Sequence, residues 1–268
     1  MKRAVIDIGS NSIKMIVFDS DKDIRESKYF LEIPQIVKGK KGGYLSVDSV
    51  ERALRSLEIL KEKAEVAEIY AYATESLRSA KNSDIFIERA RKYGIEVEIL
   101  DTKDEAKIAY ESVKLNYKGD FCVCDIGGAS SEICNGEMFL SFPVGSLVLF
   151  ENPKKLDFKV DIKTSKLYAI GGTALVIAQI FSEDYSLNHE DRIIRKYELI
   201  DLIEKFKNMD FKDRIEKYSK VEPKRLRIID RGMEILLHIL EELHLEEVHI
   251  SMNVGMYGYA SLRGLIND

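Results

Sequence analysis

Hydrophobic and polar residues follow two rhythms along the chain, one typical of strands and the other of helices. Short apolar runs rich in branched residues cover Arg3–Ile8 and Ile13–Phe18, and the polar cluster at 9–12 between them predicts a hairpin with a polar tip. From Ser46 to Lys63, apolar residues recur at helical spacing, which predicts a helix, and Glu65–Ala73 returns to a strand pattern. The chain therefore begins as an α/β protein.

The second half repeats this opening plan. It has a strand over Phe121–Ile126, a glycine-rich turn at 127–129, a strand over Ser130–Cys134 and a further strand that ends at Phe142. An aspartate precedes the turn of each hairpin, which suggests an internal duplication. Helices and strands alternate elsewhere, with helices at 83–93, 103–113, 173–180, 196–207 and 223–243, and strands at 95–100 and 247–251.

The length of the chain, 268 residues, is comfortable for two domains. The polar break at 116–119 marks the boundary between them. We therefore expect a first domain at 1–116 and a second at 117–253, with the tail from about 254 to 268 returning to the first.

Charge and composition narrow the class of protein. The formal net charge of -5 argues against nonspecific binding to nucleic acid or to an anionic membrane, because both need a broad field of lysine and arginine. The three cysteines, in apolar or strand-like surroundings, are expected to be reduced core thiols. With neither a signal-peptide core nor a membrane-spanning apolar run in the sequence, we expect a cytoplasmic protein.

Three glycine-containing turns are candidates for binding an anion. Glycine and small polar residues let backbone N–H groups approach a phosphate without side-chain collision. The turns are Asp7–Ser12, Asp125–Glu132 and Ile170–Thr173, and the last lies at a strand-to-helix junction, where helix N-terminal amides are free. The carboxylates of the second turn also suit a hard cation such as Mg²⁺. A single turn of this kind is weak evidence, but three in this order are stronger.

The order of these turns resembles the superfamily of actin, the heat-shock ATPases and the sugar kinases. More specifically, Asp7–Met15 looks like the opening of the exopolyphosphatase/guanosine pentaphosphate phosphohydrolase (Ppx/GppA) family, and Ala73–Asn82, with the sequence ATESLRSAKN, resembles a specific motif of that family. Asp104–Tyr110, Asp125–Glu132 and Gly171–Thr173 continue the match. The resemblance covers nearly the whole chain and fits the short, two-domain form of the family.

This resemblance implies two actin-like (ribonuclease H-like) domains with an interdomain cleft. It implies a Mg²⁺-dependent hydrolase that releases terminal orthophosphate from inorganic polyphosphate or guanosine pentaphosphate. Such a reaction needs an activated water, neutralisation of phosphoryl charge and alignment of the leaving phosphate. The resemblance leaves open which of the two substrates is preferred, and whether two copies associate as a homodimer.

The family's functional residues carry over to named positions. Glu105 matches the catalytic glutamate, which activates or positions the attacking water, and Arg78 matches an arginine that binds phosphoryl oxygens. Asp7, Asp125 and Glu132 would associate with Mg²⁺. The phosphate-binding positions are Gly9, Ser10, Asn11, Ser12, Lys14, Gly127, Gly128, Ala129, Ser130, Ser131, Gly172 and Thr173.

Each of these residues also has a plainer explanation. Glu105 is equally typical of an acid in the first turn of a helix, Arg78 of a surface ion pair, and the aspartates of turn capping. The lysines at 38, 40 and 41 either line a path for a polyanion or belong to a solvated loop.

Two departures from the family pattern keep other functions open. Ala129 stands where a third glycine is usual, and Met256 stands where an arginine is usual, so a contact to guanosine tetraphosphate or to a long chain is expected to be missing. One alternative is therefore a catalytically weak phosphate- or nucleotide-binding sensor. An actin-like ATPase or kinase is the other, although the segment around Arg78 and the helix of Glu105 speak against it.

Overall fold

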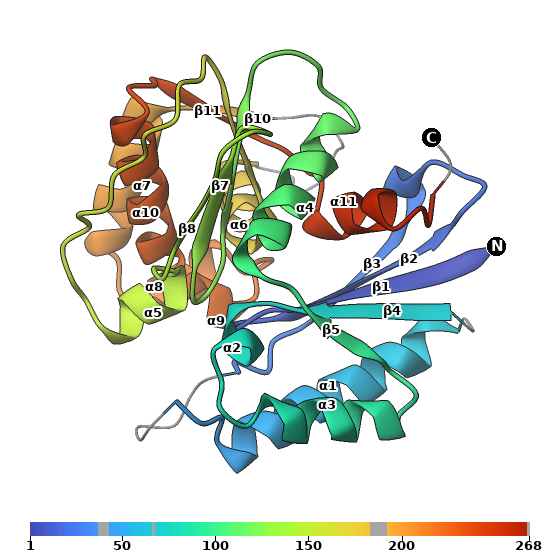
Figure 1. Ribbon diagram of the computed structural model, residues 1–268. Coiled ribbons are helices and arrows are strands. Elements are labelled where there is room, and N and C mark those ends of the chain that lie inside the picture. Colours follow the sequence, from blue (N-terminus) through green and yellow to red (C-terminus); the bar gives the residue numbers. More distant parts are fainter. Residues whose placement is uncertain (37–42, 66–67, 183–191, 267–268) are drawn as a thin grey trace. The chain divides into compact units, whose positions relative to one another are not determined.

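The computed structural model describes residues 1–36, 43–65, 68–182 and 192–266 (Figure 1). The chain forms two compact units, and each of them contains one mixed sheet with helices, which confirms the predicted α/β class. The first unit comprises Met1–Glu111 and Gly255–Asp268, and the second comprises Ser112–Val254. The predicted domain limits, after residue 116 and near residue 254, stay a prediction about which residues fold as independent domains.

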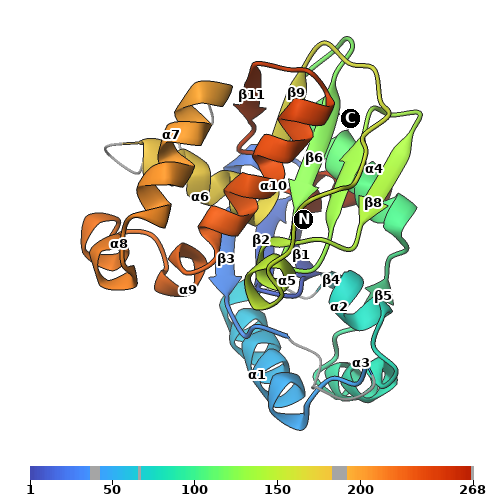
Figure 2. The same cartoon turned by 90° about the vertical axis from the view of Figure 1, so that its left-hand side faces the viewer.

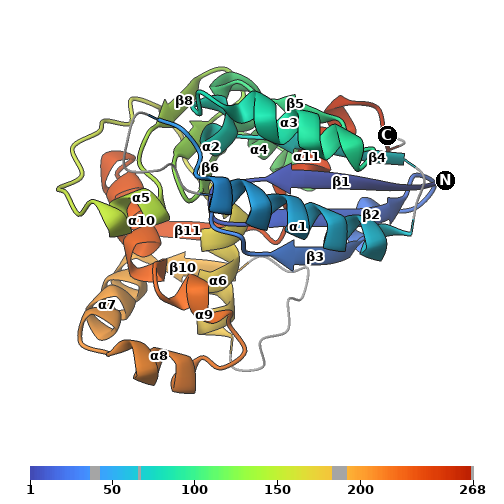
Figure 3. The same cartoon turned by 90° about the horizontal axis from the view of Figure 1, so that it is seen from below.

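The first unit is built on a five-stranded sheet in the order β3-β2-β1-β4-β5. β1 and β2 form the predicted antiparallel hairpin, whereas β1, β4 and β5 run parallel. In Figure 1, α1 and α3 cover one face of this sheet and α11 lies on the other, and Figure 3 shows α1 along the sheet. The strands are β1 (Lys2–Ile8), β2 (Ile13–Asp19), β3 (Lys28–Glu32), β4 (Glu68–Ala73) and β5 (Val97–Ile99).

The helices of the first unit follow from local sequence signals. α1 begins where the Ser46 hydroxyl accepts a hydrogen bond from the Ser49 N–H, and its apolar stripe, which includes Leu54 and Leu57, is buried against the sheet. The other elements are η1 (Ile24–Glu26), α1 (Val47–Ala64), α2 (Glu75–Arg78), α3 (Ser83–Lys92), α4 (Thr102–Lys114) and α11 (Gly255–Leu262).

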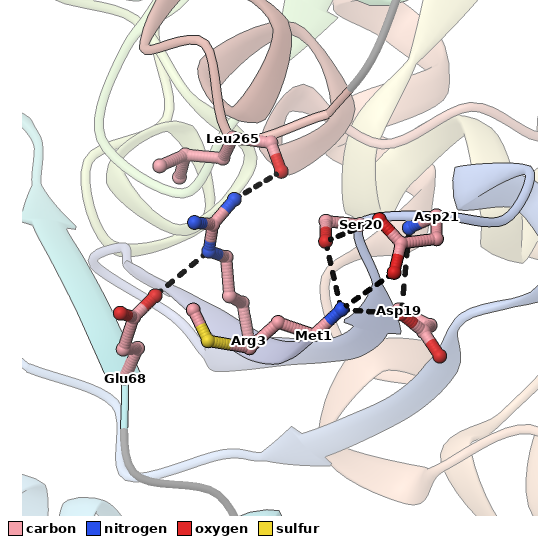
Figure 4. A network of polar contacts seen from close by, with 7 residues as sticks. All are labelled: Met1, Arg3, Asp19, Ser20, Asp21, Glu68 and Leu265. Atoms are coloured by element: carbon pink, nitrogen blue, oxygen red, sulfur yellow. Dashed lines mark hydrogen bonds and ion pairs between the residues drawn. The ribbon is translucent and has the colours of Figure 1, made fainter.

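The C-terminal segment is tied to the first strand of the chain by side-chain contacts. The Arg3 guanidinium donates to the Leu265 carbonyl at 2.9 Å and to the Glu68 carboxylate at 2.7 Å (Figure 4). Tyr259 of α11 stacks on Tyr72 of β4 with ring centroids 4.8 Å apart. These contacts complete the first unit with residues from both ends of the sequence.

The second unit has a six-stranded sheet in the order β10-β11-β9-β6-β7-β8 (Figure 2). β6, β9 and β11 run parallel, and β6-β7-β8 form an antiparallel meander. The strands are β6 (Cys122–Ile126), β7 (Ser131–Cys134), β8 (Phe139–Phe142), β9 (Leu167–Ile170), β10 (Arg192–Arg195) and β11 (Glu247–Ile250). The helices are α5 (Ser146–Glu151), α6 (Gly171–Phe181), α7 (Lys196–Lys207), α8 (Phe211–Lys217), α9 (Pro223–Leu226) and α10 (Ile229–Glu242).

The single helix predicted over 223–243 is wrong, because the chain forms two helices there. α9 begins at Pro223, with the Glu222 carboxylate accepting from the Arg225 N–H as an N-cap, and ends after one turn. α10 starts at Ile229 and places one face in the core. The break turns the segment so that Leu226, Ile228 and Ile229 are all buried, which a continuous helical stripe does not achieve.

Other predictions concern the cysteines, the membrane and two short stretches of chain. The three cysteines are buried on β6 and β7 without a disulfide, and burial raises the pKa of the Cys122 thiol to about 12. Within the described ranges, no helix combines the length and apolar character needed to cross a membrane. The lysines at 38, 40 and 41, and part of the predicted strand at 66–67, lie outside the described residues.

Candidate functional site

The candidate residues of the first unit gather where its parallel strands end. Ile8 at the end of β1 pairs in register with Ala73 at the end of β4, and Ala73 in turn pairs with Ile99 of β5. The Thr74 N–H donates to the Ile8 carbonyl at 3.2 Å, and the Leu100 N–H donates to the Ala73 carbonyl at 3.0 Å. The carboxyl ends of parallel strands are where α/β proteins commonly bind ligands.

The first glycine turn is a closed loop between β1 and β2. The Gly9 N–H donates to the Ser12 carbonyl at 3.0 Å, and a Cβ on Gly9 would lie 3.2 Å from the same oxygen. The carbonyls of Ser10 and Asn11 accept from the N–H groups of Ile36 and Gln35, at 2.6 and 3.2 Å. The tip of the hairpin is therefore held by main-chain bonds.

Asp7 and Lys14 face each other across this hairpin. They are register partners on β1 and β2, and the Lys14 ammonium lies 2.8 Å from an Asp7 carboxylate oxygen. Each side chain is only 13% exposed, so this is a partly buried pair with strong mutual attraction. The negative charge of Asp7 is thus balanced by an ammonium group of the same hairpin.

The structure brings the two predicted catalytic residues into direct contact. Arg78 of α2 donates through Nη1 to a Glu105 carboxylate oxygen at 2.9 Å and to the Leu100 carbonyl at 2.9 Å. Glu105 lies in the first turn of α4, whose start is fixed by the Asp101 carboxylate accepting from the Asp104 N–H at 2.7 Å. The Arg78 and Glu105 side chains are 17% and 16% exposed.

Glu75 is a third member of this cluster, and the sequence analysis missed it. Its carboxylate accepts from Arg78 Nη2 at 2.8 Å. Burial lowers the pKa of the Arg78 guanidinium, but the hydrogen bond and charge of Glu105, with those of Glu75, outweigh burial and raise that pKa. The spacing of Glu75 and Arg78, three residues apart on one helix, was the signal that could have revealed this contact.

The second glycine turn has the same bonding as the first. The Gly127 N–H donates to the Ser130 carbonyl at 2.9 Å, and a Cβ on Gly127 would lie 3.1 Å from that oxygen. The Gly128 carbonyl accepts from the first turn of α5, and Gly145 before α5 is so close that its Cβ would lie 2.4 Å from Gly128. Ala129 is partly exposed at the tip of this turn.

Asp125 and Glu132 occupy the positions that Asp7 and Lys14 hold in the first hairpin. They are register partners on β6 and β7, and directly opposed residues in an antiparallel pair share one face of the sheet. Glu132 is only 1% exposed and accepts a hydrogen bond from the Ser141 hydroxyl at 2.9 Å. Two carboxylates therefore face one side of the second hairpin.

The third turn begins α6 beside Asp125. Gly171 has a φ of +82°, and a Cβ there would lie 2.1 Å from an Asp125 carboxylate oxygen, so only glycine fits. The Thr173 hydroxyl donates to the Ile126 carbonyl at 2.8 Å, which ties α6 to the end of β6. The Ser131 hydroxyl is fully buried and donates to the Val144 carbonyl at 2.6 Å. Both hydroxyls hold the fold together in this structure.

The predicted metal ligands differ in how well they suit a cation. No group of three or more histidine, cysteine, aspartate or glutamate residues with metal-binding geometry occurs in the described part of the chain. Mg²⁺ needs only one or two carboxylates, with water and substrate phosphates completing its shell. The opposed pair Asp125 and Glu132 supplies two carboxylates on one face of the sheet, whereas the carboxylate of Asp7 stands opposite an ammonium group.

Comparison with known proteins finds similarity to one family of phosphatases. The model of the Ppx/GppA phosphatase family matches residues 36–153, a range that contains Arg78, Glu105, Asp125 and Glu132. The chain is 27% identical over 163 residues to exopolyphosphatase 1 of Mycobacterium tuberculosis, which covers 54% of this chain and 47% of that protein. It is 30% identical over 158 residues to the guanosine-5'-triphosphate,3'-diphosphate pyrophosphatase of Aliivibrio fischeri, covering 54% and 31%.

One further relative matches along nearly the whole chain. It is the bifunctional 3-dehydroquinate synthase/phosphatase of Fusobacterium nucleatum, 26% identical over 317 residues, which covers 99% of this chain and 47% of that protein. The chain thus spans less than half the length of each of these three curated relatives.

Solved structures show the same fold. The Ppx/GppA enzyme of Aquifex aeolicus superposes with a TM-score of 0.74 at 26% identity, covering 97% of this chain and 98% of that one. An exopolyphosphatase from Cytophaga hutchinsonii superposes with a TM-score of 0.83 at 19% identity, covering 100% and 99%. These comparisons confirm the resemblance predicted from the motifs: the chain is similar to the Ppx/GppA phosphatases.

Proposed function

We propose that this chain is a Mg²⁺-dependent phosphohydrolase that releases terminal orthophosphate from inorganic polyphosphate, guanosine pentaphosphate or both. The observation that carries the proposal is the contact between Arg78 and Glu105 at the carboxyl ends of β4 and β5. A carboxylate beside a cation is the minimum needed to orient a water and to neutralise a phosphoryl group. The similarity to an exopolyphosphatase and to a guanosine-5'-triphosphate,3'-diphosphate pyrophosphatase supports the two substrates.

In the proposed reaction, Glu105 positions a water and accepts its proton as the water oxygen attacks the terminal phosphorus. The bond between that phosphorus and the bridging oxygen breaks, and the shortened chain leaves with the bonding electron pair. During this step, Arg78 offers its guanidinium to the phosphoryl oxygens, a geometry that its planar fork suits and an ammonium group does not. Glu75 orients that fork through its contact with Nη2.

Asp125 and Glu132 would hold the magnesium ion. When bound, a magnesium ion supplies charge neutralisation for phosphoryl oxygens. The opposed pair of carboxylates on β6 and β7 is the observation that favours them over Asp7. The main-chain N–H groups of the glycine turns would bind phosphate oxygens, as glycine-rich loops commonly do.

The test compares Glu105→Gln with Asp104→Asn, a matched loss of one carboxylate at an exposed position in the same helix turn. Phosphate release would be measured with short and long polyphosphate, guanosine pentaphosphate and ATP in the presence of Mg²⁺. We expect Glu105→Gln to lower kcat by about 100- to 10,000-fold, the range typical of a lost general base. Asp104→Asn should stay within about threefold of the wild type, because surface changes rarely disturb a site.

A phosphate-binding sensor with weak catalysis is the second candidate. It is favoured by the engagement of Arg78, whose guanidinium contacts Glu105, Glu75 and the Leu100 carbonyl in this structure. Ligand-dependent stabilisation without phosphate release would identify a sensor and would contradict the hydrolase. Release confined to ATP would instead identify an ATPase.

A further inference from the structure

Buried polar atoms without a partner are concentrated in one short segment of the second unit. Among the described residues, four buried side-chain atoms have no hydrogen-bond partner, and three of them lie between 225 and 231, in Arg225, Asp230 and Arg231. A buried polar atom left unpaired costs free energy comparable to a lost hydrogen bond. Such a concentration calls for a missing partner at this place.

Arg225 is the residue in this segment with a buried guanidinium nitrogen that has no acceptor among the described residues. Its side chain belongs to a residue only 7% exposed, and Nη2 has no hydrogen-bond partner among the described residues. Asp230, the next acid after Arg225 in the sequence, has one carboxylate oxygen 3.5 Å from the Arg214 guanidinium, and its other oxygen is buried without a hydrogen-bond partner in the described ranges. Glu222 accepts from the Arg225 main-chain N–H rather than from its guanidinium. Within the described part of the chain, this buried guanidinium therefore lacks an acceptor for Nη2, which is costly unless an anion binds.

The Arg225 guanidinium points at the start of α6. A Cβ built on Gly172 would lie 3.6 Å from Nη2 and 3.8 Å from the central carbon of the guanidinium, so a side chain at this position would touch the guanidinium. Gly232, at the other end of the same segment, packs so tightly on Thr173 that its Cβ would lie 2.5 Å from the threonine methyl. The segment 225–232 thus lies directly on the first turn of α6.

The start of α6 adds donors to this cation. α6 has 11 residues, and the first N–H groups of a helix have no acceptor inside it. Its macrodipole places partial positive charge at the same end. No side-chain oxygen caps this helix, since its N-cap residue is Ile170. Gly172 is partly exposed, which gives a small ion access to the turn.

One carboxylate lies near the same turn and limits where an anion fits. Asp125 is packed against Gly171, whereas Arg225 is packed against Gly172. An anion bound beside Arg225 therefore meets the guanidinium and the helix N–H groups, and it must approach from the Gly172 part of the turn. A tetrahedral oxyanion suits these donors, because its oxygens accept the two arms of an arginine fork and main-chain N–H groups together.

We propose that Arg225 and the N-terminus of α6 form an oxyanion site that binds a phosphoryl group within the second unit. The proposal deepens the proposed function, on which its identification of phosphate as the ligand rests, by adding Arg225 as a binding residue. Arg225 itself takes no part in the proposed hydrolytic step, so its effect on phosphate binding can be measured separately from phosphate release.

The experiment measures binding of inorganic phosphate to the full chain by calorimetry and by the shift of the thermal midpoint, with chloride at equal ionic strength as reference. It uses the Glu105→Gln background, so that turnover plays no part. Arg225→Gln is compared with Arg227→Gln, an equal loss of charge at an exposed arginine two residues away. Arg225→Lys, which keeps the charge and loses the fork, is the third variant.

We expect Arg225→Gln to weaken phosphate binding by about 10- to 100-fold, the value of one lost charged hydrogen-bonding group. Without phosphate, the same variant should have a thermal midpoint no lower than its parent, because it removes an uncompensated buried charge. Arg227→Gln should bind phosphate like the parent, and Arg225→Lys should lie between the two.

Two results would overturn the site. One is equal phosphate binding by Arg225→Gln and its parent. The other is a clear loss of stability in phosphate-free Arg225→Gln, which would make Arg225 a structural residue. Phosphate binding that depends on Arg225, in a wild-type chain that releases no phosphate, would uphold this site and reject the hydrolase. If the wild-type chain released phosphate and Arg225→Gln did not alter phosphate binding, the hydrolase would be upheld and the Arg225 site rejected.

Discussion

The hairpins that open the two units share a backbone but differ in charge. In each, a glycine N–H donates to the carbonyl of a serine three residues later, and an aspartate is the next-to-last residue of the strand before the turn. Opposite that aspartate stands Lys14 in the first hairpin and Glu132 in the second. The opposed pair therefore consists of an acid and a base in the first hairpin, and of two acids in the second. The comparison teaches that one residue opposite the aspartate sets the charge of a hairpin whose backbone is shared.

The largest expected effect comes from giving the second hairpin the charge of the first. Glu132→Lys would place an ammonium group opposite Asp125 and fill the position proposed for magnesium. We expect phosphate release to fall by more than about 100-fold, beyond the loss typical for residues in the outer shell of a metal. The assay is initial rate against Mg²⁺ concentration. Glu137→Lys, the same charge change at an exposed position in the next turn, is the control.

A nearly active Glu132→Lys would break the comparison, because the acidic pair would then have no role in the reaction. Equal loss in Glu137→Lys would point to a general effect of charge rather than to the opposed pair.

Removing the counter-charge of the first hairpin should affect stability before activity. Lys14→Met leaves the Asp7 carboxylate, 13% exposed, without the ammonium that lies 2.8 Å from it. We expect a loss of about 2 kcal/mol in the free energy of unfolding, below the 3–5 kcal/mol typical of a fully buried pair. Urea denaturation followed by circular dichroism measures it, with Lys28→Met, an exposed lysine on β3 of the same sheet, as control.

If Lys14→Met had the same urea midpoint as the control, the ion pair between Lys14 and Asp7 would not contribute to stability. If Lys14→Met and the control had similar stability but Lys14→Met lost most of its phosphate release, Lys14 would be assigned to substrate binding rather than to stabilising the fold.

The smallest effect on activity and stability is expected at the tip of the second turn. Ala129→Gly would restore the glycine that the family pattern has there and would remove one methyl group from a partly exposed position. We expect stability to fall by less than about 1 kcal/mol, through the greater freedom of glycine in the unfolded chain. The kcat should change by no more than about threefold, because the backbone bonds of the turn do not involve residue 129. A tenfold gain in kcat would show that the methyl group obstructs the substrate.

Much of the architecture follows from local patterns, and the exceptions have physical causes. The hairpins around Gly9 and Gly127 could be predicted because their apolar runs and turn residues agree. The edge strands β3 and β10 were missed, because edge strands such as Lys28–Glu32 bury little and show no clear alternation. The break between α9 and α10 was missed because it depends on packing that joins distant residues.

The candidate site was predictable only where a motif recorded it. Arg78 and Glu105 were identified from their motifs, and their contact could not be, because 27 residues separate them in the sequence. The sequence assigned no role to Arg225. The proposal for Arg225 rests on one buried guanidinium nitrogen that has no acceptor among the described residues, and only coordinates reveal this. The sequence also could not show that the hydroxyls of Ser131 and Thr173 are used by the fold.

The return of the C-terminal segment has a consequence for synthesis on the ribosome. Residues of α11 and Leu265 supply contacts to Tyr72 and Arg3 in the first unit, whereas the second unit is encoded entirely between 112 and 254. A nascent chain therefore has all of its second unit before it has the last parts of its first. The unit whose translation begins first is the one that is completed last.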